Sequence, residues 1–155
     1  MPVVINIPEI AFWFAITFGA AVIGSKFRPG EWYSELVKPG WVPPDKLFAP
    51  VWIVLYILMA ISAWIIWNIY GYQAVFQLSL YLVQLLLNAA WSFLFFGLHK
   101  IRWAFVDIML LWTAILATMI SFWSLEPLAG VLLIPYILWV SFAVFLNAAF
   151  MTLNS

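Results

Sequence analysis

The sequence predicts an all-α membrane protein: a single bundle of five transmembrane helices with a long loop between helices 1 and 2. Hydrophobic residues make up 68% of its 155 positions and charged residues 8%, whereas soluble domains have about 45–50% apolar and about 25% charged residues. Charged and turn-forming residues divide the chain into five apolar stretches, and a helix needs about 20 such residues to cross the hydrocarbon core. Because backbone polar groups in lipid must be satisfied internally, and a barrel's alternating pattern is missing, we expect helices.

The apolar stretches place the five predicted helices at about 7–25, 47–69, 76–98, 103–124 and 128–153. In the first stretch, Ala20 and Gly24 are small residues one turn apart, which favours close packing on a neighbouring helix. In the fifth, Pro135 removes the hydrogen bond to the carbonyl of Val131, so we expect a kink there. No internal repeat or linker divides the chain, so residues 1–155 are predicted to form one domain.

The distribution of basic residues predicts the orientation of the helices. With five crossings, the loop 26–46, the connection 99–102 and the C-terminus lie on one side, and this side holds all six Lys and Arg residues. The positive-inside rule places that side in the cytoplasm and the N-terminus outside, and we expect a bacterial cell membrane.

Composition also excludes several kinds of partner and cofactor. The net charge of zero leaves no basic face for nucleic acid. The lack of cysteine excludes disulfides, iron–sulfur clusters and a thiolate haem ligand. The chain has one histidine, His99, and a single histidine without a second ligand does not predict a metal site. Membrane lipid is therefore an expected partner, and no cofactor is required.

The loop 26–46 concentrates charge and proline. Seven of the twelve charged residues lie between Lys26 and Lys46, and five of the nine prolines lie between positions 29 and 50. One interpretation is a polar connector in which Pro43 and Pro44 merely start the second helix. The segment is too long and too stiff for a simple turn, so we favour a lid over the cytoplasmic mouth of a pocket, with Tyr33 and Trp41 pointing inward.

Three of the predicted helices carry polar, aromatic or small side chains on one face, because residues three or four apart share a face. A bundle that enclosed these faces would form a cavity with aromatic walls and a few hydrogen-bonding groups. The predicted ligand contacts on these faces are Trp52, Tyr56, Gln84, Asn88, Trp91, Tyr136, Trp139, Ala143 and Asn147.

Each of these residue types has an ordinary structural explanation as well. Amide side chains hold membrane helices together, and tryptophans anchor helices at the interface. We expect the tryptophans near helix ends or without polar neighbours to anchor or pack: Trp13, Trp64, Trp67, Trp103 and Trp123. Asp107 is the only charge well inside a predicted helix. It could belong to a proton or ligand path, but we favour a carboxylate near the interface, paired with Arg102 or Lys100.

Three segments resemble the TspO/translocator protein family, also called tryptophan-rich sensory protein or peripheral-type benzodiazepine receptor. They are "WYSELVKPGWVPPDKLFAPVWIVLYILMA" (32–60), "QLLLNAAWSFLFF" (84–96) and "LLIPYILWVSFAVFLNAAF" (132–150). The resemblance implies a five-helix bundle, often a homodimer, that binds tetrapyrroles such as protoporphyrin IX and also benzodiazepine-site ligands. The family's pocket positions fall on Tyr33, Trp52, Asn88, Trp139 and Ala143.

One family feature is missing. Animal relatives carry a cholesterol-recognition pattern late in the fifth helix, but here Ala148 stands at its Tyr position and Thr152 at its Arg position. Such motifs are weak, and their loss leaves sterol binding through this element doubtful.

Three functions fit the sequence. A porphyrin-binding protein or sensor is the first, because a flat macrocycle would stack on the tryptophans. A light-dependent porphyrin-degrading enzyme is the second; the chain shows no conventional catalytic group, so Trp52, Trp139 and Tyr33 would serve as photochemical partners. A transporter of tetrapyrroles or lipids is the third, although the chain has no inverted repeat and no line of buried ionisable groups.

Overall fold

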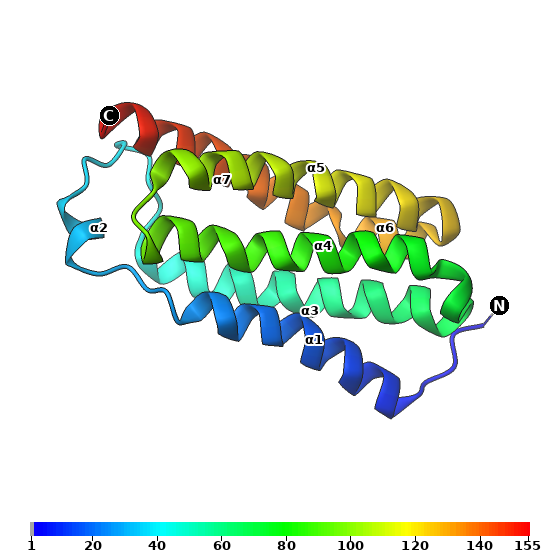
Figure 1. Cartoon of the computed structure of the whole chain (residues 1–155). Coiled ribbons are helices and arrows are strands. Elements are labelled where there is room, and N and C mark those ends of the chain that lie inside the picture. Colours follow the sequence, from blue (N-terminus) through cyan, green and yellow to red (C-terminus); the bar gives the residue numbers. More distant parts are fainter. Residues whose placement is uncertain (1) are drawn as a thin grey trace.

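The computed structural model describes residues 2–155, and all regular structure in this range is helical (Figure 1). The long helices are α1 (Ile7–Ser25), α3 (Asp45–Tyr70), α4 (Val75–Ser92), α5 (Ile101–Leu125) and α7 (Ile134–Leu153). The short ones are α2 (Glu31–Glu35), a 3₁₀ turn η1 (Gly71–Ala74), a π-helical turn η2 (Phe93–Gly97) and α6 (Pro127–Leu132).

Local chemistry explains where these helices begin and end. At the start of α1 the Asn6 side chain accepts a hydrogen bond from the backbone N–H of Glu9, which caps the first turn. Gly71 ends α3 with φ 52°, a left-handed conformation that glycine adopts at little cost. His99 also has a positive φ, 56°, where the chain turns from η2 into α5.

The long helices lie side by side along one axis (Figure 1). Helix α5 packs against α4 and α7, α1 packs against α3 and α4, and α6 packs against α3. The C-terminus and α2 lie at one end of the bundle, and the N-terminus lies at the other. All six basic residues belong to the end that carries α2, since they lie in or beside the connections α1–α3 and α4–α5.

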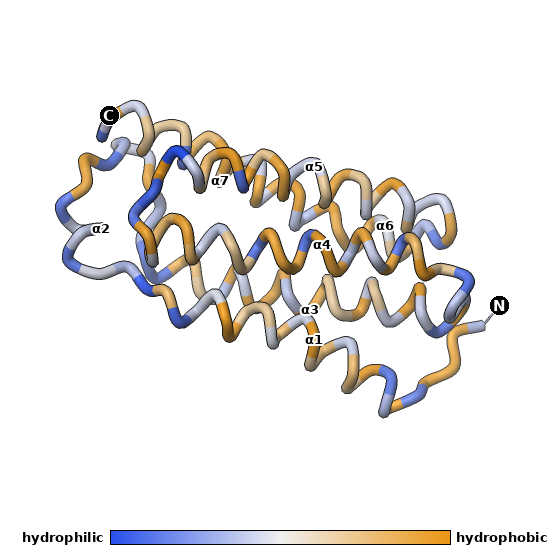
Figure 2. Tube along the Cα trace, in the orientation of Figure 1, coloured by the Kyte–Doolittle hydropathy of each residue, from blue (hydrophilic) through white to orange (hydrophobic). Residues whose placement is uncertain are grey.

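Apolar residues predominate along the long helices, and hydrophilic residues are more frequent at the two ends of the bundle (Figure 2). Large hydrophobic side chains are exposed on the outside of the helices, for example Ile53, Leu86, Leu138 and Phe145. Soluble proteins rarely expose so many large hydrophobic side chains. Four segments are long and apolar enough to cross a membrane, one of which, Asp45–Gly97, spans 53 residues. Gly71 divides this one into α3 and α4, which lie side by side (Figure 1). The chain is therefore an integral membrane protein with four or five long apolar helices.

The fifth apolar segment is interrupted next to Pro135, where the sequence predicts a kink. The segment 128–153 is broken into α6 and α7 at Leu133, and Pro135 lies in the first turn of α7. A proline in the first turn has no hydrogen bond to lose. The break lets α6 pack against α3, where Oγ of Ser62 donates a 2.7 Å hydrogen bond to the carbonyl of Ala129.

Candidate functional site

A cavity of about 450 Å³ lies inside the bundle, toward the end that carries α2. Helices α1, α3, α4, α5 and α7 contribute to its walls, and Phe27, Arg28, Pro29 and Tyr33 of the connection α1–α3 also line it. Of the residues predicted as ligand contacts, the structure places these around the cavity: Tyr33, Trp52, Tyr56, Asn88, Trp91, Trp139, Ala143 and Asn147. A site of this size suits a drug-sized or cofactor-sized ligand.

Indole rings from three helices form the aromatic walls. Trp52 of α3 lies against Tyr56, with ring centroids 5.6 Å apart. Trp139 of α7 meets Phe48 edge to face at 5.7 Å, and Trp91 of α4 stacks on Phe95 of η2 at 5.0 Å. These offset and edge-to-face contacts fix the ring orientations, so the walls are formed before any ligand enters.

A chain of hydrogen bonds crosses the floor of the cavity. The Tyr56 hydroxyl donates to Oδ1 of Asn88 at 2.6 Å, and Nδ2 of Asn88 donates to the hydroxyl of Tyr136 at 2.8 Å. The Tyr136 hydroxyl in turn donates to Oε1 of Gln84 at 2.7 Å. Such bonds are strongly directional in an apolar interior. They therefore hold the Asn88 amide in one orientation at the edge of the cavity.

A second polar contact supports the wall near α2. Nε1 of Trp91 donates to Oδ1 of Asn147 at 2.9 Å, and Nδ2 of Asn147 donates to the carbonyl of Ile101 at 3.2 Å. Helices α4, α7 and α5 are thereby joined. Because its N–H is already used, Trp91 presents an apolar ring face to the cavity.

The segment around α2, which is the predicted lid, contributes Tyr33 to the cavity and is anchored at two points. Tyr33 is buried, with its ring against Phe95 and Phe150. Burial raises the pKa of the Tyr33 phenol, and the nearby carboxylate of Asp45 raises it further. Farther along, the backbone N–H of Val37 donates to Oδ1 of Asn154 at 2.9 Å, and Nδ2 of Asn154 donates to the Val37 carbonyl at 3.0 Å.

Several lining residues were not predicted from the sequence. Arg28 and Asp45 line the cavity near its cover, and Phe48 and Phe96 complete the aromatic wall. Arg28 lies in the connection between α1 and α3, where a charged residue is ordinarily a solvated surface group. Its residue type therefore does not identify it as a ligand contact. Phe96 lies in a run of apolar residues where helical spacing could not choose an inward face, because η2 shifts the register.

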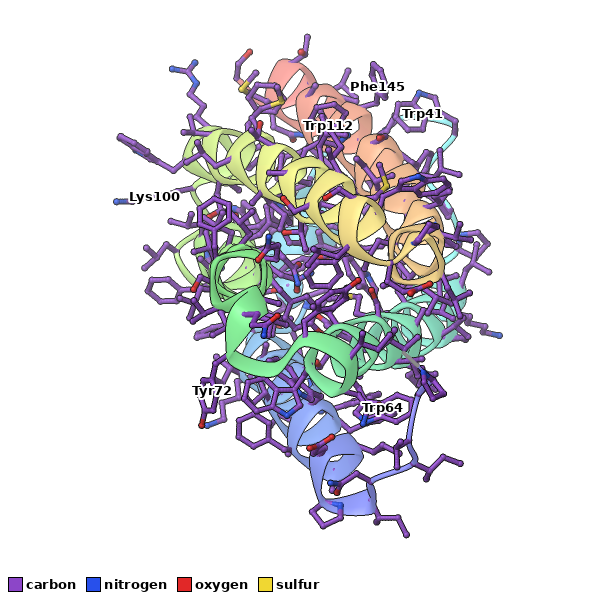
Figure 3. The ribbon with its side chains drawn as sticks, turned by 90° about the vertical axis from the view of Figure 1, so that its right-hand side faces the viewer. Trp41, Trp64, Tyr72, Lys100, Trp112 and Phe145 are labelled. Carbon is purple, nitrogen blue, oxygen red and sulfur yellow. The ribbon has the colours of Figure 1, made fainter. Side chains whose placement is uncertain are left out.

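Three predicted contacts lie outside the cavity. Trp41 is half exposed, with its ring against Phe142 rather than pointing inward as predicted, and Figure 3 shows it at the edge of the bundle. Gln84 and Tyr136 are fully buried behind the wall, where they orient Asn88. They support the floor and do not line the cavity.

Asp107 does not form the ion pair that we favoured. Its side chain is buried on α5, and Oδ2 has no hydrogen-bond partner among residues 2–155. Both predicted partners are exposed: Arg102 lies in the first turn of the same helix, and Lys100 directly precedes the helix. The separation arises because Asp107 lies on the face of α5 that points into the bundle, whereas Arg102 lies on its outer face.

Comparison with known proteins gives consistent matches over almost the whole chain. A family model described as TspO/MBR family matches residues 11–153. The chain is 40% identical to Protein CrtK of Rhodobacter capsulatus over 146 residues, 93% of this chain and 91% of that protein. It is 40% identical to the Translocator protein of Homo sapiens (91% and 86% covered) and 37% identical to the Tryptophan-rich sensory protein of Cereibacter sphaeroides (86% and 84% covered).

Proposed function

The chain belongs to the TspO/MBR family, and we propose that it is a membrane binding protein or sensor for a flat tetrapyrrole of the protoporphyrin IX type. The observation that carries this proposal is the pair Trp52 and Trp139, which bring indole rings from two different helices to one cavity. Relatives bearing the names sensory protein and translocator protein support a role in sensing or binding.

The proposed ligand suits the chemistry of the residues that line the cavity. A porphyrin is flat, aromatic and largely apolar, so its faces would stack on indole rings. Asn88 would meet its polar edge with the Nδ2–H that Tyr136 does not use. Arg28 would face the ring's carboxylates, since it lines the same cavity beside the α2 segment. Benzodiazepine-site ligands would compete for the same aromatic walls.

We further propose that the chain crosses the membrane five times, with α1, α3, α4, α5 and the unit α6–α7 as the crossings. The end that carries α2 and all six basic residues would face the cytoplasm, and the N-terminus would face outside. Residues 26–44 would then cover the cytoplasmic mouth of the site. A ligand would enter from that side when the cover moves.

Trp139→Ala tests the site. We expect porphyrin affinity, measured from the change in porphyrin fluorescence on titration, to fall about tenfold or more, because the variant loses a stacking surface. Trp123→Ala is the matched control, since Trp123 lies on α5 outside the cavity and its substitution should leave affinity unchanged. Equal affinities in wild type and Trp139→Ala would exclude this cavity as the porphyrin site.

Photochemical degradation is a second candidate function. Trp52, Trp139 and Tyr33 all line the cavity, so oxidisable rings would surround an excited porphyrin. Light in the presence of oxygen should bleach the bound porphyrin faster with wild type than with a Trp52→Phe, Trp139→Phe double variant. Equal bleaching rates at equal occupancy would exclude an enzyme that uses these tryptophans and leave the binding role.

A further inference from the structure

A second cavity, of about 360 Å³, opens at the basic end of the molecule. The start of α5 and the end of α7 form it. It is lined by His99, Lys100, Ile101, Arg102, Trp103, Met151, Asn154 and Ser155. None of its lining residues lines the aromatic cavity. It therefore belongs to a different part of the molecule from the proposed porphyrin site.

Two cations, Lys100 and Arg102, line this second cavity. Lys100 and Arg102 are exposed, and neither forms an ion pair within the described part of the chain, residues 2–155. Lys100 projects away from the bundle (Figure 3). The N-terminus of α5 adds positive partial charge, because no side chain caps it and the helix is 25 residues long. The C-terminal carbonyls of α7, on the other wall, carry a partial charge of the opposite sign. The cavity thus offers two cations and free backbone N–H groups to an anion.

His99 is held rigidly at the edge of this cavity. Its ring stacks on Trp32 of α2, with centroids 4.2 Å apart and planes within 11°. Its backbone has φ 56°, which is costly for a residue other than glycine, and the N–H of the following Lys100 is fixed by a 2.9 Å hydrogen bond to the Leu94 carbonyl. The turn therefore holds the imidazole and the backbone of Lys100 in place before any ligand binds.

An apolar strip leads away from the cations along α5. Trp103, Val106 and Leu110 recur at three- and four-residue spacing and are 62%, 49% and 55% exposed. They lie on one helical face, which runs from the charged end toward the apolar middle of the bundle. The surface is therefore cationic at the level of lipid headgroups and apolar where acyl chains lie.

We propose that this second cavity binds the headgroup phosphate of an anionic phospholipid, with Lys100, Arg102 and the N-terminus of α5 as donors. The acyl chains would lie along Trp103, Val106 and Leu110. A basic pocket between membrane helices attracts such headgroups, and helix N-termini bind phosphate groups through free N–H groups. Soluble phosphate shares the charge of the headgroup but would leave the apolar strip unused.

Native mass spectrometry of the full-length protein in detergent tests the proposal. Wild type should carry a dioleoyl phosphatidylglycerol adduct more than a phosphatidylcholine adduct at equal lipid concentrations. Lys100→Gln with Arg102→Gln should reduce that preference about tenfold, since each cation near the headgroup contributes to it. The matched control is Lys26→Gln with Lys46→Gln, which removes the same charge from exposed positions outside the second cavity and should keep the preference.

Three results would overturn the proposal. The first is a wild type without preference for the anionic lipid, and the second is a control pair that loses it as fully as the test pair. The third is displacement of the lipid by glycerol phosphate at concentrations equal to those of the lipid, which would make the site one for a soluble anion. Thermal unfolding of each variant in the same detergent shows whether the bundle is folded, independently of any ligand in the aromatic cavity.

Discussion

The Tyr56 hydroxyl donates a 2.6 Å hydrogen bond to Oδ1 of Asn88, and this bond joins α3 to α4 at the floor of the aromatic cavity. Asn88 is also bonded to Tyr136 of α7 through Nδ2. A single amide therefore connects three helices. Its remaining N–H and lone pair are the groups left for a ligand.

Asn88→Leu should lower both stability and ligand affinity. The substitution keeps an apolar side chain of similar size but leaves the hydroxyls of Tyr56 and Tyr136 without this partner, at a cost of about 1–3 kcal/mol. Thermal unfolding in detergent measures the first effect, and porphyrin titration measures the second. Ser92→Ala is the control, because Ser92 lines the same cavity outside this chain of hydrogen bonds. Unchanged unfolding of Asn88→Leu would show that the amide does not hold the helices together.

Helical spacing predicts which residues face the cavity, but it does not distinguish residues that line the cavity from residues buried behind them. Trp52, Asn88 and Trp139 were each placed on an inward face by their neighbours three and four positions away, and the structure places all three around the cavity. The same spacing put Gln84 with Asn88, although Gln84 lies one turn deeper, behind the wall. The face of a helix on which a residue lies indicates the direction of its side chain. Whether that side chain reaches the cavity depends on how the other helices pack.

The remaining differences arise where the chain leaves regular helix. Arg28 and Trp41 lie in the connection between α1 and α3, where no periodicity indicates which side chain points inward. The structure places Arg28 at the cavity and Trp41 at the surface. The break at Leu133 and the π turn η2 likewise depend on packing against α3 and α5, which a single sequence does not show.

Arg28→Gln should distinguish porphyrins by their carboxylates. If Arg28 faces the ring's carboxylates, the variant should bind protoporphyrin IX about two- to fivefold more weakly, as expected for a partly exposed ion pair. Its affinity for the dimethyl ester of the same porphyrin should match that of wild type. Fluorescence titrations with the two ligands make the comparison within one protein. Equal losses for both ligands would show that Arg28 acts on the cover and not on the ligand.

The cover should control how fast a ligand leaves. Replacing residues 34–42 with a flexible Gly/Ser segment removes the ordered backbone that Asn154 holds at Val37. We expect the porphyrin dissociation rate, measured by stopped-flow fluorescence, to rise several-fold, because a flexible cover opens at a lower cost. Association and dissociation rates equal to those of wild type would contradict the lid.

Tyr33 should make the cover sensitive to alkaline pH. Its pKa is raised by burial, and further by Asp45, so the folded cover favours the neutral phenol. The neutral phenol stabilises the folded cover fully below about pH 10, the ordinary pKa of tyrosine. This stabilisation is lost as pH rises through the higher pKa that Tyr33 has in the folded protein. The phenolate absorbance of wild type minus that of Tyr33→Phe should therefore show a midpoint above pH 10. Asp45→Asn should lower the midpoint only slightly, because burial is the larger cause.

Gly130 should not tolerate a side chain. A Cβ at this position would lie 2.7 Å from Cβ of Trp123 and 2.9 Å from its Cα, so the backbone of α5 or α6 would have to move. Gly130→Ala should lower the free energy of unfolding by about 1–3 kcal/mol, the usual cost of overpacking. At Gly19 of α1 an added Cβ meets no atom within 4 Å, so Gly19→Ala should be neutral or stabilising. Urea or thermal unfolding of both variants in one detergent compares them, and equal stabilities would mean that α6 is free to shift relative to α5.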